Sequence, residues 1–229
     1  SHATNLVNSD NNGQEDIFVH DRQTGITERA SVHSNGTEGN GQSYASRISA
    51  DGRSVVFYSH ASNLVADDNN GIRDIFVHDR QMGTTERVNV HSNGTEGNSS
   101  SWNHSISADG RYVAFSSHAT NLVNSDNNGQ EDIFIHDRQM GATERVSAHS
   151  NGTEGNGQSN ADWDVAGLIS ADGRSILFES HASNLVDDDN NGNKDLFVHD
   201  RETGITERVN VHSDGTEGNS RTWNHSISA

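Results

Sequence analysis

The chain has 229 residues, of which 29% are hydrophobic, and its 33 acidic residues against 15 lysines and arginines give a formal net charge of −18. This charge disfavours nucleic acid and anionic membrane surfaces as partners, because both repel an acidic protein. The lack of cysteine excludes disulfides and thiolate metal sites, and no apolar stretch is long enough for a membrane-spanning helix. The low hydrophobic content leans toward disorder, but regularly spaced strand-like runs argue against it.

Four copies of one repeat make up the sequence. The string SHATNLV and its variants begin at Ser1, Ser59, Ser117 and Ser180. The third copy is five residues longer than the first two, and the additional residues fall within Asn160–Leu168. Self-similarity at a period of this size is typical of repeat architectures. We therefore expect residues 1–229 to form a single repeat array.

Each full copy contains four short runs typical of β-strands, with β-branched or aromatic residues and glycine-containing polar boundaries. In chain order, one set comprises Trp102–Ser107, Tyr112–Ser116, Asp132–His136 and Thr143–Ala148. An Ala-Asp-Gly-Arg segment lies between the first and second runs, at 50–53, 108–111 and 171–174. Asp-Gly is a strong signal for a tight hairpin turn. No segment has a helical period with helix caps, so the sequence predicts an all-β fold.

Four antiparallel strands per repeat, placed side by side by repetition, predict a β-propeller. A parallel β-helix would need shorter rungs, and a β-sandwich would not explain the period. The Asp-Gly-Arg strand occurs three times, whereas the other three strands occur four times. The sequence thus predicts a propeller one strand short of four full blades. Because an open sheet edge invites pairing, we expect the array to continue in a longer polypeptide or to be completed by assembly.

The run ISADGRYVAFSSHATNLV from Ile106, followed by DNNGQEDIFIHDRQMGATERVS, resembles the bacterial TolB-type propeller repeat, the Pro-Asp-Gly-Arg class. The resemblance covers essentially the whole chain, although alanine replaces the proline of the usual turn and the chain has no proline. It implies a propeller fold. Members with an Asp-x-Asn-Gly insertion before the third strand are typically surface or secreted proteins of environmental bacteria. The resemblance implies no single activity, because propellers serve as scaffolds, receptors, lectins and enzymes.

An acidic loop, Asp-Asn-Asn-Gly-x-x-Asp, precedes the third strand of every repeat. It offers side-chain oxygens at positions 1, 3 and 7, and the glycine at position 4 permits a sharp bend. Calcium binds about six to eight oxygens in a loop that can curl around it. We therefore predict one Ca²⁺ per repeat, held by positions 1, 3 and 7 and by a backbone carbonyl near position 5. The predicted ligand residues are Asp10, Asn12, Gln14, Asp16, Asp68, Asn70, Ile72, Asp74, Asp126, Asn128, Gln130, Asp132, Asp189, Asn191, Asn193 and Asp195.

The same loop could be turn chemistry alone, with Asn and Asp side chains capping their own backbone. Four copies that keep the oxygens while position 5 varies favour a metal site, although the copies share one ancestor and are not independent. A calcium ion that binds only the folded state adds ~2.7 kcal/mol at a hundredfold excess over its dissociation constant. Several such ions would compensate for a thin hydrophobic core.

Histidines and aromatic residues also repeat. Twelve of the fourteen histidines fall at three places in the repeat, and none forms a zinc-binding motif, so we expect them to be surface or hydrogen-bonding residues. An aromatic residue follows the Gly-Asn-rich loop in each copy. Such side chains either contact carbohydrate or pack between blades. The candidates for ligand binding are Tyr44, Trp102, Trp163 and Trp223.

No catalytic residues are predicted, because near-identical repeats supply the same groups everywhere whereas a catalytic centre is usually asymmetric. We expect a calcium-stabilised, extracellular or cell-surface propeller that serves as a non-enzymatic scaffold, interaction or assembly module. Its expected partner is a protein, in self-assembly or on a surface, or else a glycan. One alternative is a multivalent, lectin-like propeller with a weak site in each repeat. A second is an enzyme with a site near the third-repeat insertion around Trp163.

Overall fold

The computed structural model describes residues 1–160, 168–220 and 226–227. Within these ranges the chain is all-β, and no helix could span a membrane. The strands are β1 (Phe18–His20), β2 (Thr27–Arg29), β3 (Ser43–Ile48), β4 (Ser54–Ser59), β5 (Asp74–Asp79), β6 (Thr84–Arg87), β7 (Ser101–Ile106), β8 (Tyr112–Ser117), β9 (Asp132–Asp137), β10 (Ala142–Arg145), β11 (Ser159–Asn160), β12 (Ser175–Ser180), β13 (Asp195–Asp200) and β14 (Ile205–Arg208).

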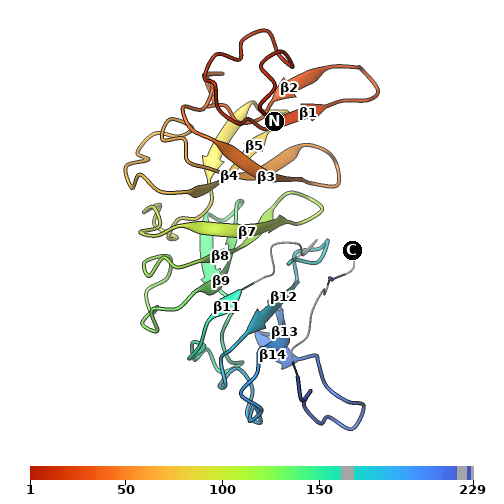
Figure 1. The fold of residues 1–229 in the computed structure, drawn as a ribbon. Coiled ribbons are helices and arrows are strands. Elements are labelled where there is room, and N and C mark those ends of the chain that lie inside the picture. The colour runs from red at the N-terminus through yellow and green to blue at the C-terminus, as the bar shows by residue number, and fades with distance from the viewer. Residues whose placement is uncertain (161–167, 221–225, 228–229) are drawn as a thin grey trace.

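The strands form successive antiparallel sheets that follow one another in a curved row (Figure 1). We call them the first blade (β1 and β2), the second (β3 to β6), the third (β7 to β10) and the fourth (β11 to β14). In the last three blades each strand pairs with its neighbour in sequence. This is the meander of a propeller blade, which confirms the predicted fold. The strand after the Asp-Gly-Arg turn occurs three times in the described residues, as β4, β8 and β12.

The fourth strand of each blade is shorter than predicted. The expected run Thr143–Ala148 ends its strand at Arg145. Beyond this point a side chain replaces a ladder bond, because the backbone N–H of Ile133 donates to Ser147 Oγ at 3.1 Å. Ala148 then forms an isolated bridge with Glu154. The chain therefore leaves the sheet where polar side chains take over the pairing, which strand propensity alone does not reveal.

The Asp-Gly turn forms the predicted hairpin, but with a four-residue loop rather than two residues. Ser49 N–H donates to the carbonyl of Ser54 at 2.9 Å, so residues 50–53 make the loop. Gly52 has a φ of +72°, a conformation that glycine adopts without steric cost. Asp51 accepts hydrogen bonds from Ser49 Oγ at 2.5 Å and from the N–H of Arg53 at 2.9 Å.

The hydrophobic core lies between blades. Three clusters of buried side chains each combine residues of two successive blades. In the second blade, for example, Phe57 packs toward the first blade, whereas Val56 packs toward the third. This alternation follows from the period of two along a strand buried on both faces. Each blade therefore depends on its neighbours for burial.

Candidate metal centre

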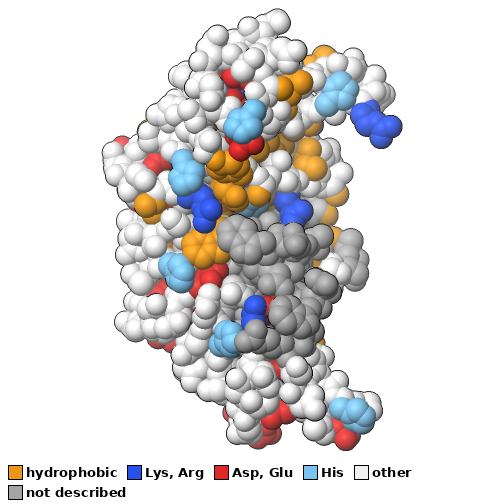
Figure 2. All heavy atoms as spheres, viewed as in Figure 1, with side chains coloured by type: hydrophobic (Ala, Val, Ile, Leu, Met, Phe, Trp, Pro, Cys, Tyr) orange, Lys and Arg blue, Asp and Glu red, His pale blue; other side chains and the backbone are white. Residues whose placement is uncertain are grey.

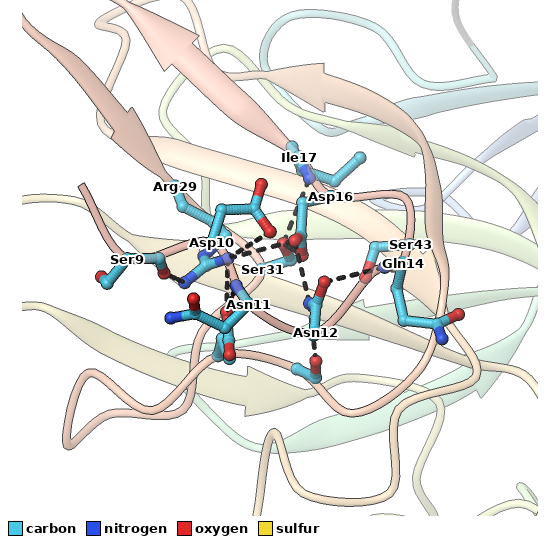
Figure 3. Close-up of polar contacts among 12 residues, drawn as sticks. Ser9, Asp10, Asn11, Asn12, Gln14, Asp16, Ile17, Arg29, Ser31 and Ser43 are labelled. Carbon is cyan, nitrogen blue, oxygen red and sulfur yellow. Dashed lines mark hydrogen bonds and ion pairs between the residues drawn. The ribbon is translucent and has the colours of Figure 1, made fainter. Parts of the chain in front are cut away.

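The acidic loop of the first blade closes around the side chain of Asn12 (Figure 3). Its Oδ1 accepts a hydrogen bond from the backbone N–H of Gln14 at 2.8 Å. Its Nδ2 donates to Asp16 Oδ2 and to the carbonyl of Gly39, both at 2.9 Å. The bend that the sequence predicted at Gly13 is present, with a φ of +66°. Because a donor faces one end of the amide and acceptors the other, the orientation of Asn12 is fixed.

An arginine side chain reaches into this loop from β2 (Figure 3). Nη1 of Arg29 lies 2.9 Å from Glu38 Oε2, 3.1 Å from Asp16 Oδ2 and 3.5 Å from Asp10 Oδ1. Nη2 donates to the carbonyl of Ser9 at 2.6 Å. The arginine side chain is only 6% exposed. A single guanidinium therefore serves three carboxylates at the place where the sequence predicted a calcium ion.

The same arrangement, which we call the loop cluster, recurs in every blade. In each case Nη1 lies 2.8–2.9 Å from the glutamate and 3.1–3.8 Å from the two aspartates. The four loop clusters are Asp10, Asp16 and Glu38 with Arg29; Asp68, Asp74 and Glu96 with Arg87; Asp126, Asp132 and Glu154 with Arg145; and Asp189, Asp195 and Glu217 with Arg208.

The arginine and the glutamate of the loop cluster are not among the ligand residues predicted from the sequence. A signal for both was present, because they follow the first aspartate at the same distances in all four copies. Arg29 lies 19 positions and Glu38 28 positions after Asp10. The five-residue insertion of the third copy falls outside this interval, so the spacing survives it. Charged residues kept at fixed offsets within a divergent array indicate a shared contact.

Each loop cluster holds more negative charge than its arginine balances. Three carboxylates and one guanidinium leave a formal charge of −2. Burial, opposed by Arg145 and hydrogen bonds, raises the pKa of Asp132 to about 6. Burial and the neighbouring Asp74 raise the pKa of Asp68 to about 6 as well. In the described part of the chain, Oδ1 of Asp126 is buried without a hydrogen-bond partner. A further cation would relieve this excess.

The carboxylates are close enough together to hold a metal ion. In the second and fourth blades, one oxygen from each of the three acids lies within 4.8 Å of the others. Oxygen-only sets suit hard cations such as calcium.

Of the predicted ligands, the aspartates at positions 1 and 7 converge, as Asp68 and Asp74 do. Position 3 instead directs its amide nitrogen at the second aspartate, since Asn70 Nδ2 donates to Asp74 Oδ2 at 3.0 Å. Position 5 donates its N–H to that asparagine, as Ile72 does at 2.9 Å.

The third-strand histidines have the hydrogen-bonding role expected of them. In every blade Nδ1 of this histidine lies 2.9 Å from the hydroxyl of a threonine on the neighbouring strand. For His78 and His136, burial lowers the pKa of the imidazole. These side chains therefore join two strands of one blade.

Two of the four candidate aromatic residues lie on the first strands of their blades. Tyr44 on β3 pairs with Tyr58, and Trp102 on β7 pairs with Ser116. In the fourth blade the equivalent place on β11 belongs to Asn160, which pairs with Glu179. Trp163 and Trp223 lie outside the described residues. The aromatic position is thus not repeated in the third copy.

No protein-family model matches the chain, and no curated protein matches it. Among solved structures, the chain is similar to the tricorn protease, with 15% identity and a TM-score of 0.52 over 84% of this chain and 19% of that one. It is also similar to an oligogalacturonate lyase in complex with manganese, with 11% identity and a TM-score of 0.52 over 86% and 48%. A putative TolB from Agrobacterium tumefaciens shares 18% identity, with a TM-score of 0.48 over 86% and 56%.

The chain spans little more than half the length of TolB and less of the other two proteins. Identities this low show a shared fold alone, and the two enzymes show that the fold occurs in catalytic proteins. Together with the meander sheets, the likeness places the chain among all-β propellers.

Proposed function

We propose that the chain is a non-enzymatic propeller module that binds calcium in its loop clusters and acts as an extracellular or cell-surface scaffold. Its partner would be another protein or further copies of itself. The observation that carries the proposal is the buried loop cluster, in which three carboxylates share one arginine in every blade. A structural role fits a group that recurs unchanged.

Charge and geometry support calcium as the further cation. A divalent ion would neutralise the formal charge of −2 that the arginine leaves in each cluster. Calcium accepts irregular oxygen sets at about 2.3–2.6 Å, and it completes them with water or carbonyl oxygens. Extracellular modules bind calcium at about 10⁻⁴–10⁻³ M, an affinity that suits a site already containing one internal cation.

The arginine of each loop cluster occupies part of the place that a calcium ion would take. Nη1 of Arg87 touches the carboxylates of Asp74 and Glu96 that an ion would also use. Calcium binding therefore requires the guanidinium to move aside or to keep only some of its contacts. Arg87 Nη2 also bonds the loop carbonyl of Asp67 at 3.3 Å, which gives the guanidinium a place to remain.

The non-enzymatic part of the proposal rests on repetition. Each loop cluster has the same partners, so none is distinguished as a reaction centre. The alternative of an enzyme site near Trp163 falls on residues 161–167, outside the described part of the chain. A lectin with one equivalent site in every repeat would need the aromatic position in each copy, and Asn160 replaces it in the third.

Calcium titration followed by native mass spectrometry tests the proposal. We expect up to four ions per chain, a melting temperature that rises with calcium and falls in chelator, and a weaker effect of magnesium, which prefers a strict octahedral site. A chain that binds no calcium at millimolar concentration, and whose melting temperature ignores chelator, would refute the proposal.

A further inference from the structure

The strand that opens the second and third blades is where these repeats differ most. Its sequence is SYASRI in β3 and SWNHSI in β7, whereas the motifs DNNG and TEGN recur unchanged in all four copies. The position just before the third strand also varies in charge, with Glu15, Arg73, Glu131 and Lys194 in the four copies. This position contacts the first strand of the next blade, since Ser101 N–H donates to the carbonyl of Arg73 at 3.2 Å. The divergent positions therefore lie together in space.

Arg73 lies between two aromatic rings from two blades. Its guanidinium carbon is 4.8 Å from the ring centroid of Tyr58 and 5.4 Å from that of Trp102. Tyr44 extends the aromatic group, with its ring centroid 5.5 Å from that of Tyr58. Figure 2 shows hydrophobic side chains gathered on this face over β3 and β7, with Lys or Arg side chains on both sides. We call Tyr44, Tyr58, Arg73 and Trp102 the aromatic ledge.

Arg73 is held by aromatic rings rather than by an acid. Its Nε is buried and has no hydrogen-bond partner, and no carboxylate in the described ranges forms an ion pair with it. Most other arginines of this acidic protein are ion-paired, as Arg80 is with Glu28. Stacking between two rings holds the guanidinium in place while leaving the edge of its plane for an anion.

A cavity of about 110 Å³ adjoins the ledge, between β3 and β7. Arg47, Tyr58 and His104 line it, together with Ala45, Ser46 and Asn103. Burial, opposed by the backbone of Ala45 and assisted by the charges of Arg47 and Arg73, lowers the pKa of His104 to about 4. Both ring nitrogens of His104 are buried, and neither has a hydrogen-bond partner of normal geometry in the described residues. Two guanidiniums thus act on one small cavity.

The backbone at this cavity is strained. Ala45 and Asn103 have φ values of +47° and +48°, in the left-handed region that non-glycine residues rarely adopt. Both lie where the register of the first strand shifts, between Tyr44 and Arg47 and between Trp102 and Ser105. Strain of this kind persists only where the surroundings enforce it, and it is concentrated at binding sites.

We propose that the aromatic ledge and its cavity bind a sugar ring that carries an anionic group, a carboxylate or a sulfate. The aromatic faces supply the apolar surface against which a pyranose ring stacks, and Arg73 supplies a charge-assisted hydrogen bond to the anion. Arg47 lines the cavity and Arg73 acts on it, so a group that carries a negative charge is favoured there over a neutral one. Among the described residues, only this place combines these side chains, and the proposal does not depend on calcium binding, although Arg73 adjoins Asp74 of the second loop cluster.

The repeats themselves supply variants that the fold accepts. Arg73→Glu introduces the residue found at the equivalent place in the first and third copies. Trp102→Asn introduces the residue of the equivalent place on β11. Arg22→Glu, at an exposed arginine in the turn between β1 and β2, is the matched charge control. Equal melting temperatures of these proteins would show that any loss of binding is local.

The test is titration of tryptophan fluorescence, supported by calorimetry, with tetrasaccharides of a uronic acid, of a sulfated sugar and of a neutral sugar. We expect saturable binding of at least one anionic tetrasaccharide, at least tenfold weaker binding of the neutral one, and at least tenfold weakening by Arg73→Glu and by Trp102→Asn but not by Arg22→Glu. The anionic arm that binds identifies the group as carboxylate or sulfate.

Three results would overturn the proposal. One is no saturable binding of either anionic sugar, and another is binding that Arg73→Glu leaves unchanged. The third is equal binding of an oligoglutamate peptide, which would show that charge alone is recognised. Repeating the titration in chelator controls for the loop cluster, because Arg73 directly precedes Asp74 in the acidic loop. Sugar binding should not depend on calcium, since no ledge side chain belongs to a loop cluster.

Discussion

Arg87→Met tests whether the loop cluster is a site for two cations or for one. The arginine side chain is 7% exposed and touches three carboxylates at 2.8–3.6 Å. Removing one partner of a buried ion pair costs about 3–5 kcal/mol, because charge is left uncompensated. Without calcium, we expect Arg87→Met to lose stability of this order in urea denaturation, since Asp68, Asp74 and Glu96 then repel one another.

Calcium should restore much of that loss. An ion that binds only the folded state adds ~2.7 kcal/mol at a hundredfold excess over its dissociation constant, and the variant should bind calcium more tightly than the natural chain because the competing guanidinium is gone. The matched control is Arg53→Met in the same blade, where a 42%-exposed arginine pairs with Asp79 alone. Asp79 keeps hydrogen bonds from the backbone N–H groups of Gln81 and Met82, and the arginine is half-exposed, so we expect a smaller cost of about 1 kcal/mol, with or without calcium.

Two results would refute this reasoning. If Arg87→Met loses equal stability in calcium and in chelator, the guanidinium is the cation that the cluster requires and calcium does not enter. If Arg87→Met costs no more than Arg53→Met, the carboxylates of the cluster are not held in the buried, charged state that the geometry implies. Urea midpoints in both buffers decide between these outcomes.

Three further predictions follow from single groups. Because the pKa of Asp68 and of Asp132 is raised to about 6, protons compete with calcium below that pH, so stabilisation by calcium should shrink between pH 7 and pH 5; a constant difference in urea midpoint would contradict this. The pKa of His104 is about 4 in the folded chain against an ordinary 6.5, so the unfolded chain binds the proton more readily. The free energy of unfolding should therefore fall by about 3 kcal/mol from pH 6.5 to pH 4. His104→Ser, which introduces the residue of the equivalent position Ser46, should make this fall smaller. Gly129→Ala should cost about 1–2 kcal/mol, because φ is +65° although no atom lies within 4 Å of the added methyl group; an unchanged melting temperature would show that the loop bend is not fixed.

Local signals in the sequence were enough to predict the fold and half of the loop cluster. The period and the Asp-Gly turns indicated antiparallel blades, and the positions of Asp10, Gly13 and Asp16 indicated a closed acidic loop. The role of Asn12 was harder to foresee, because an amide can accept or donate and only the tertiary contact with the Gly39 carbonyl decides its orientation. Arg29 lies on a different strand, and sequence spacing alone does not say which strands meet.

The aromatic position shows a different limit. Trp163 was assigned by its distance from the Gly-Asn-rich loop, yet the strand register puts Asn160 in the place of Trp102. An insertion of a few residues leaves the register of a strand undetermined until its partner is known, since a shift of one residue exchanges the two faces. The pairing of Asn160 with Glu179 settled what composition could not.

The loop cluster recurs in every copy of the repeat, whereas the aromatic ledge is formed at one place in the described residues. The two differ because each copy must keep the contacts that its own blade needs to fold, while other positions are free to diverge. Every blade must close its own acidic loop, so a substitution at Arg145 would destabilise the third blade whatever the other copies contain. The positions of the aromatic ledge have to bind a ligand at only one place in the array, so Tyr58 and Arg73 could diverge from Ser116 and Glu131 without loss to the remaining blades. Positions identical in all copies are therefore those where stability is at stake, and positions that differ at equivalent places are where recognition should be sought.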